Sequence, residues 1–233
     1  MKTWTYILLT SNLQWDSHIT LISSKAYKQL GLLCCSFSSA VHINAKRSLY
    51  SSLIRSRLVY CSQIWRPYLR KDITLLERVQ MRATKFILND FSSNYKSRLI
   101  ALRLLPLMMV YELYDISFFI KCLKQPTASF NIMNYIKFSA GSTRSSSFPK
   151  LVHPSVKTNK SKCFYFNRLP WLWNSLPPID LNQSHDTIMN SIKTHFWDYF
   201  MDNFDDNITC TFHFCCPCHT CSSSNRMNFN ANS

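Results

Sequence analysis

The densest group of potential metal ligands in this chain lies near its C-terminus. Seven Cys and His side chains fall between residues 210 and 221. Two residues separate Cys210 from His213, and two separate Cys218 from Cys221. This spacing lets both members of a pair reach one tetrahedral zinc ion. The pattern therefore predicts a structural zinc site, with Cys210, His213, Cys218 and Cys221 as the expected ligands.

The exact ligand set stays open. Only four residues lie between the two pairs, much fewer than in ordinary zinc fingers, so the site would be a compact knuckle. Cys215, Cys216 and His219 occupy the same stretch and could each replace one of the four ligands. The alternative is a tail of free or oxidised thiols that binds no metal. The remaining cysteines stand in apolar contexts, and we expect them to be buried thiols; they are Cys34, Cys35, Cys61, Cys122 and Cys163.

The charge of the chain is large and uneven. The formal net charge is +15. Nine Lys or Arg and no acid lie between Asp16 and Asp72, and the same holds between Asp115 and Asp180. Residues 180–206 instead contain six acids and one lysine. This segregation indicates a body that meets a polyanion such as RNA or DNA, and a tail that does not. The alternative is a basic surface without a partner.

The apolar pattern predicts a mainly α protein with little strand. Only two glycines occur, which disfavours a barrel or sandwich rich in tight turns. Arg78, Arg82 and Lys85 recur at helical spacing and form a basic stripe. The expected helices cover residues 16–35, 44–60, 73–88, 95–105 and 106–123, and a last helix runs to about 201. The expected caps are Asp16 or Ser17 for the first helix, Asp72 for the helix over 73–88, and Ser184 or Asp186 for the last helix.

Two other segments have a distinct character. Residues 139–162 read as an extended linker, and 163–166 as a short aromatic run with strand character. The most apolar window, 104–120, contains Glu112 and Asp115. Because two central acids disfavour a bilayer span, we expect a buried helix there and no membrane partner.

The most distinctive motif lies at residues 166–178, where Asn167-Arg168 is followed by Trp173-Asn174-x-Leu176-Pro177. This combination resembles a segment downstream of the polymerase core in reverse transcriptases of non-LTR (LINE-type) retrotransposons. Four further segments resemble the same family in the same order, so that the resemblance covers about residues 11 to 221. They are Leu13-x-Trp15-x-x-His18-Ile19 with Lys25-Ala26, Leu53-Ile54-Arg55-Ser56-Arg57-Leu58 with Tyr60-Cys61-Ser62 and Trp65, Leu76-Glu77-Arg78-Val79-Gln80 with Arg82-Ala83-Thr84, and Tyr95-x-x-Arg98-Leu99 with Leu104-Leu105-Pro106-Leu107.

The resemblance implies a region that follows the palm and helps to grip template and nascent strand. It implies three parts: a helical thumb-like bundle at 1–130, an irregular Ser/Pro-rich connector at 131–184, and a C-terminal helix with the Cys/His cluster at 185–233. It also implies contacts with the RNA or DNA backbone, because guanidinium and ammonium groups bind phosphates and release counterions. The candidates are Arg55, Arg57, Arg78, Arg82 and Lys85, although each of them taken alone could be a solvated helix residue.

The chain departs from the family in its chemistry. The polymerase core would lie before residue 1, and its carboxylates, which hold two Mg²⁺ ions, are absent from this sequence. The pair Asp205-Asp206 directly follows Phe204 and an expected helix, unlike the aromatic-x-Asp-Asp hairpin of a polymerase. The histidines show no pattern of nucleophilic catalysis. We therefore expect no Mg²⁺ site and no enzymatic activity by itself; the alternative to nucleic-acid binding is a non-functional remnant or a structural interaction module.

We expect protein prepared under reducing, zinc-replete conditions to contain about one zinc ion per chain, because the predicted set makes one tetrahedral site. Elemental analysis measures this ratio. Changing both Cys218 and Cys221 to Ser should abolish zinc binding. Zinc-free wild-type protein, or zinc retained by the double variant, would contradict the predicted site.

Overall fold

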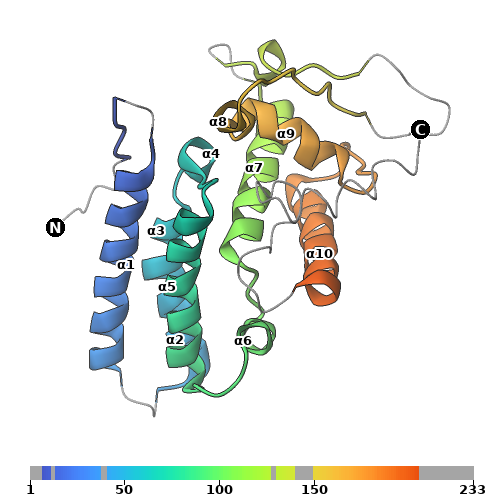
Figure 1. The fold of residues 1–233 in the computed structure, drawn as a ribbon. Coiled ribbons are helices and arrows are strands. Elements are labelled where there is room, and N and C mark those ends of the chain that lie inside the picture. Colours follow the sequence, from blue (N-terminus) through green and yellow to red (C-terminus); the bar gives the residue numbers. More distant parts are fainter. Residues whose placement is uncertain (1–6, 12–13, 38–40, 127–129, 140–148, 205–233) are drawn as a thin grey trace. The chain divides into compact units, whose positions relative to one another are not determined.

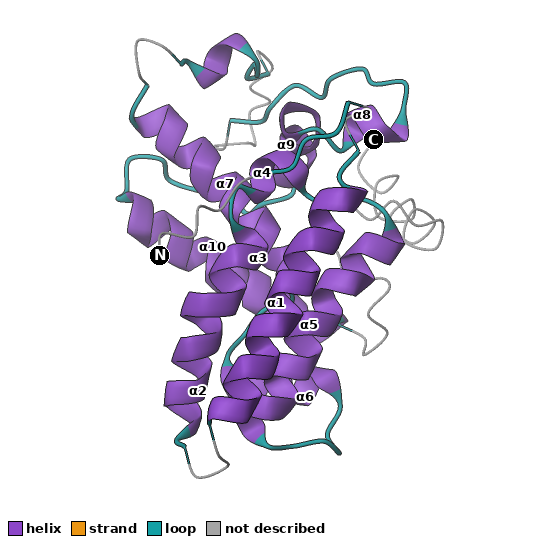
Figure 2. Ribbon diagram, turned by 90° about the vertical axis from the view of Figure 1, so that its left-hand side faces the viewer, coloured by secondary structure: helices purple, strands orange, loops and turns teal. Residues whose placement is uncertain are grey.

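Helices make up all the longer elements of the described structure. The computed structural model describes residues 7–11, 14–37, 41–126, 130–139 and 149–204 (Figure 1). Within these ranges the only β pairing is an isolated antiparallel bridge between Phe138 and Leu151, and no strand is drawn (Figure 2). The expectation of a mainly α protein is confirmed. Among the described helices, none combines the length and the apolar character that a bilayer crossing requires.

The described residues fall into two compact units. Unit 1 consists of residues 7–108 together with Phe204, and unit 2 of residues 109–203. The helices of unit 1 are α1 (Asp16–Ser36), α2 (Ile43–Leu49), the π-helix η1 (Tyr50–Arg55), α3 (Ser56–Val59), α4 (Ser62–Trp65), α5 (Arg70–Leu88) and α6 (Tyr95–Leu102). Those of unit 2 are α7 (Leu107–Lys124), whose first two residues still belong to unit 1, η2 (Ile132–Asn134), α8 (Asn159–Lys162), α9 (Tyr165–Asn174) and α10 (His185–Asn203).

Unit 1 is organised around α1 and α5, which lie side by side (Figures 1 and 2). The two helices run parallel, since Lys71 Nζ lies 2.9 Å from Asp16 Oδ2 at their N-terminal ends. Their facing sides are apolar at helical spacing, as amphipathic helices require. The fully buried side chains of these two faces include Ile19, Ala26, Leu30, Leu76, Val79 and Ala83.

The predicted N-terminal caps of α1 and α5 were wrong. Trp15 precedes α1 and Leu69 precedes α5, and neither makes a side-chain capping bond. Asp16 and Asp72 instead lie in the first turns, where a negative charge is stabilised by the helix dipole. Because α1 and α5 are parallel, these two acids approach each other. Burial first, and then the charge of Asp16, raises the pKa of Asp72 to about 6.

Residues other than glycine take the left-handed backbone positions of unit 1. Asn89 ends α5 with φ of 52°, and Arg103 ends α6 with φ of 48°. At each end a backbone N–H returns to the last turn, from Asp90 to Lys85 O at 3.2 Å and from Leu104 to Leu99 O at 2.9 Å. Asparagine tolerates this conformation better than other non-glycine residues, so its use at α5 is consistent with a chain so poor in glycine.

The expected helix over 44–60 is present but is wound as a π-helix in its middle. The segments α2, η1 and α3 follow one another without a break. A π segment changes the phase of a helix, and here Tyr50, Ile54 and Leu58 are all buried. The periodicity of the sequence located this helix, but it did not indicate the change of winding.

Unit 2 is built on α7, which is buried along most of its length as expected for the apolar window. Its Asp115 forms a fork with Arg168 of α9, with Nε–Oδ2 at 2.8 Å and Nη2–Oδ1 at 2.9 Å. Both side chains are almost wholly buried, at 3% exposure for Arg168 and 0% for Asp115. The prediction of strand character over 163–166 was wrong. Cys163 is the C-cap of α8 and Tyr165 begins α9; Asn167 Nδ2 donates to Ser161 O at 2.8 Å and links the two turns.

The expectation of buried thiols was also wrong. Cys34 and Cys35 are exposed at the end of α1, and Cys61, Cys122 and Cys163 are half-buried. The apolar neighbours of Cys34 and Cys35 in the sequence point to different sides of the helix, so that Leu33 is buried and Leu32 is 67% exposed. Sequence neighbours on a helix do not share a face.

We expect Arg168→Met to destabilise the protein by about 3–5 kcal/mol, because it leaves the carboxylate of Asp115 buried without its charge partner. Urea denaturation followed by tryptophan fluorescence measures the loss. The double variant Asp115→Leu/Arg168→Met should be more stable than the single one, since no buried charge remains. Lys71→Met, which removes an exposed ion pair, is the control and should leave the transition unchanged. Equal losses for the single and double variants would contradict this interpretation.

Candidate nucleic-acid interface

Three of the five basic candidates lie on α5, on the side turned away from its buried face. Arg78 and Arg82 are exposed, and Lys85 is half-buried. In the described part of the chain, neither Arg78 nor Arg82 forms an ion pair with a carboxylate. The helix is anchored by buried Leu76, Val79 and other apolar side chains, so it holds the two guanidinium groups one turn apart. This is the spacing that the sequence predicted.

The basic side of α5 continues onto α1. Burial raises the pKa of Tyr27, while the nearby charges of Arg78 and Arg82 act in the opposite direction. Partial desolvation likewise raises the pKa of the Cys34 thiol, although the side chain is exposed, and the charge of Arg82 acts in the opposite direction. Tyr27 of α1 therefore lies near both arginines, and Cys34 of α1 lies near Arg82. The surface therefore combines two helices, which the sequence did not indicate.

Arg55 and Arg57 have a different setting. Arg55 is half-buried, and its Nη2 donates to the carbonyl oxygen of Leu105 at 3.0 Å. Arg57 is half-buried on α3. Arg55 thus takes part in the internal structure of unit 1. Arg78 and Arg82 are the pair that the structure presents together to solvent.

A buried polar cluster in unit 1 was not found from the sequence. Glu77 of α5 accepts hydrogen bonds from Tyr95 Oη at 2.5 Å and from the backbone N–H of Leu107 at 3.0 Å. Gln80, one turn further, donates to Leu105 O at 3.0 Å and accepts from Tyr50 Oη at 2.9 Å. The cluster joins η1, α5, α6 and the turn before α7. A Glu and a Gln at three-residue spacing inside an apolar helix were the only signal in the sequence.

Glu77 is held in an environment that opposes its charge. Burial raises its pKa to about 7, although the hydrogen bonds from Tyr95, from the Leu107 N–H and from Gln80 and the charge of Arg55 all act to lower it. The increase in pKa that desolvation of this carboxylate causes in a low-dielectric core exceeds the decrease from these four contributions. The carboxyl group gains or loses its proton near neutral pH while remaining inside the core.

The distinctive motif of residues 166–178 serves the internal structure of unit 2. Besides the Arg168–Asp115 pair, Trp173 Nε1 donates to Pro149 O at 2.9 Å. Asn174 holds Leu151 by both backbone groups, accepting its N–H and donating to its oxygen, each at 2.8 Å. These bonds fasten the segment that enters α8 to the end of α9. The side chains that make the motif unusual are therefore occupied within the fold.

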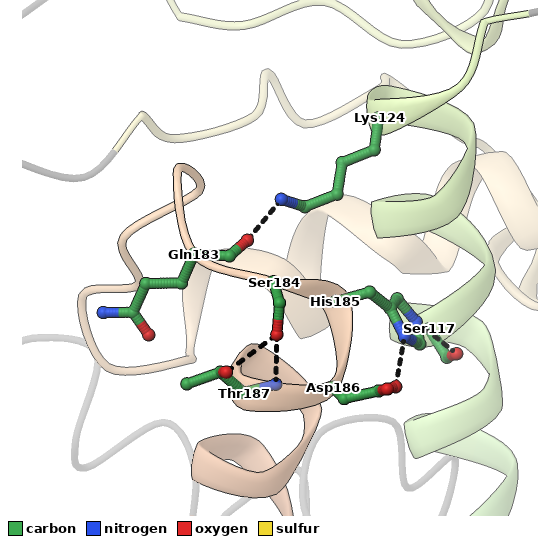
Figure 3. A network of polar contacts seen from close by, with 7 residues as sticks. All are labelled: Ser117, Lys124, Gln183, Ser184, His185, Asp186 and Thr187. Carbon is green, nitrogen blue, oxygen red and sulfur yellow. Dashed lines mark hydrogen bonds and ion pairs between the residues drawn. The ribbon is translucent and has the colours of Figure 1, made fainter.

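One Ser-His-Asp arrangement comes together in unit 2 (Figure 3). Ser117 Oγ lies 3.1 Å from His185 Nε2, and His185 Nδ1 lies 3.2 Å from Asp186 Oδ1. Asp186 is 96% exposed, so water solvates its charge and it cannot orient the imidazole as a buried acid does. Ser117 lies within α7, where the neighbouring backbone N–H groups serve the helix and leave no oxyanion site.

The same residues explain how α10 begins. Ser184 Oγ accepts the N–H of Thr187 at 3.1 Å, which confirms Ser184 as its cap. Lys124 Nζ donates to Leu181 O at 2.9 Å. It also donates to Gln183 O, as Figure 3 shows. The network therefore ties the first turn of α10 to α7. Its contacts hold the start of α10 against α7.

The predicted zinc ligands lie outside the described residues. Cys210, His213, Cys218 and Cys221, and with them Asp205 and Asp206, belong to residues 205–233. Within the described ranges, no three His, Cys, Asp or Glu side chains are grouped as a metal ion would need. The zinc site stays a prediction of the sequence.

Comparison of the chain with protein-family models, with curated proteins and with solved structures finds no match. Function must therefore be argued from the residues and their geometry.

We expect the stability of the wild-type protein to fall by roughly 2–3 kcal/mol between pH 5 and pH 8 through Glu77. The folded carboxyl group keeps its proton up to about pH 7, whereas the unfolded one releases it near 4.5, so the stability is highest below pH 4.5, falls as pH rises between the two pKa values, and levels off above pH 7. Urea denaturation across this range measures the slope. Asp72 contributes in the same direction, so the matched control is Glu77→Gln. An identical slope in Glu77→Gln would show that Glu77 is not the source.

Proposed function

We propose that this chain binds RNA or DNA through the phosphate backbone, without strong sequence preference, and that it derives from the C-terminal part of a non-LTR retrotransposon reverse transcriptase. The observation that carries the proposal is the exposure of Arg78 and Arg82 on one rigid helix, without a carboxylate partner among the described residues. Unpaired guanidinium groups at fixed spacing suit phosphate oxygens.

The distribution of acids supports the same proposal. Arg78 and Arg82 are exposed on α5, Lys25 and Lys28 are exposed on α1, and no acid lies between Asp16 and Asp72. Exposed carboxylates would compete with phosphate for these cations. Their scarcity leaves a positive field that attracts a polyanion and gives salt-dependent binding.

The proposal gives this chain no catalytic role. The polymerase carboxylates are not found in its sequence, and the Ser-His-Asp contact of unit 2 has the structural role described above. The competing proposal is a structural module without nucleic-acid affinity. It is favoured by the motif of residues 166–178, whose Arg168, Trp173 and Asn174 all serve internal contacts.

We expect affinity for duplex DNA to fall with salt, with a slope of log K against log salt of roughly −0.9 for each phosphate neutralised. Arg78→Gln/Arg82→Gln should weaken binding and reduce the slope by about 0.9 for each arginine removed. Lys193→Gln, an exposed lysine of the acid-rich segment, is the matched control and should bind as the wild type does. Fluorescence anisotropy with labelled duplex gives both quantities. No binding at low salt, or an unchanged slope in the double variant, would favour the structural module.

A further inference from the structure

Five aromatic rings from three segments of unit 2 form a continuous cluster. Tyr135, after η2, stacks on Phe166 of α9 with centroids 4.8 Å apart and planes at 17°. Its other stacked neighbour is Phe130, at 5.9 Å and 21°. Phe118 of α7 meets Phe130 at 6.5 Å and packs edge-on against Tyr165 at 5.5 Å. We call these five rings the aromatic cluster.

The base of the aromatic cluster is fixed. Tyr165 is buried, donates its hydroxyl to Asp115 O at 3.0 Å, and lies under the guanidinium of Arg168 at 5.6 Å from its ring centroid. It therefore rests on the buried ion pair of unit 2. Phe166 packs edge-on against Tyr165 at 5.3 Å. Rings supported in this way lose little conformational freedom when a ligand stacks on them.

The outer part of the aromatic cluster faces solvent. Tyr135 is 61% exposed and Phe118 is 38% exposed, although both have aromatic neighbours within reach. The buried Ile136 anchors the backbone beside Tyr135, so that Tyr135 and Lys137 both project outward. A grouped and partly exposed set of large rings differs from the single apolar residues scattered over most surfaces.

The surroundings of the aromatic cluster are basic. Lys121 is one helical turn after Phe118 on α7, Lys137 is two residues from Tyr135, and Lys162 ends the turn that leads into α9; all three are exposed. Between Asp115 and Asp180 the sequence contains no acid, and Asp115 itself is buried against Arg168. The three segments that supply the rings therefore offer cations and no exposed carboxylate.

We infer that the aromatic cluster is a stacking surface for unpaired bases of single-stranded RNA or DNA, with Lys121, Lys137 and Lys162 on the adjacent phosphates. This inference rests on the proposed nucleic-acid binding and adds a second site, in the other unit, with a different specificity. Every base has a π face, so stacking on aromatic side chains is sequence-tolerant, and it requires an unpaired strand. A proline-rich peptide also docks on aromatic rings, but it gains nothing from three lysines.

The test compares three ligands on the full chain: a short oligouridine or oligothymidine, an abasic oligonucleotide of the same length, and a duplex of the same length. The abasic strand has the phosphates without the bases. Wild-type protein should bind the single strands about 5- to 100-fold more tightly than the abasic strand. Tyr135→Ala should lose most of this preference and bind the abasic strand and the duplex as before. Tyr135→Trp should keep the preference, because it retains a ring at this position.

The controls separate this inference from the proposed function. Phe91→Ala removes an exposed ring of unit 1 and should change nothing. Arg78→Gln/Arg82→Gln should weaken all three ligands alike. Because Tyr135 stacks on two rings, its replacement by Ala should lower the thermal midpoint only slightly. Tyr135→Leu restores apolar bulk without a π face, so it should lose the preference for single strands as Tyr135→Ala does. Two results would overturn the stacking site and leave backbone binding intact. One is a preference for single strands over the abasic strand that survives in Tyr135→Ala. The other is tight binding of a proline-rich peptide that Tyr135→Ala abolishes while the binding of single strands stays unchanged. Absence of binding to any oligonucleotide would overturn both.

Discussion

Burying a carboxylate in a helical core is costly unless it is neutralised or hydrogen-bonded, and each unit of the described structure contains one that is. In unit 2, Asp115 is matched by the fork of Arg168. In unit 1, Glu77 is satisfied by hydroxyl, amide and backbone donors. The two solutions differ in consequence. The Asp115–Arg168 pair fixes α9 on α7, whereas burial raises the pKa of Glu77 to about 7, which is the basis of the pH dependence expected for unit 1.

The residues that make the sequence distinctive are largely those that meet this constraint. In the 166–178 motif, Arg168 binds a buried acid, and Trp173 and Asn174 bind the backbone of the one segment that leads into α8. Glu77 and Gln80 of α5 lie inside the core. A motif built from such residues identifies a fold more directly than an activity. The surfaces available to a partner lie elsewhere, on side chains that the motifs leave unused.

Two such surfaces differ in the physics of recognition. Arg78 and Arg82 offer charge on a rigid helix, which suits a phosphate backbone of any strandedness. The aromatic cluster offers ring faces on a fixed base, which suit bases only where they are unpaired. The rings owe their position to the buried ion pair, because Tyr165 bonds to the carbonyl of Asp115 and lies under Arg168. In unit 2, the buried ion pair and the surface rings are thus connected through Tyr165 and Arg168 of α9.

The sequence by itself determined the helices and their approximate ends, because apolar periodicity and chain-breaking residues act locally. It located α1, α5 and α10 and the approximate end of α7, and it offered Ser184 as one of two caps for α10. It also placed Arg78 and Arg82 on the exposed side of α5. Only the tertiary structure decided which distant residues meet. The partner of Arg168 is 53 residues away, and Glu77 finds donors 18 and 30 residues away. The π winding of η1 and the convergence of five rings likewise depend on packing between elements, for which the one-dimensional pattern of a helix carries no information.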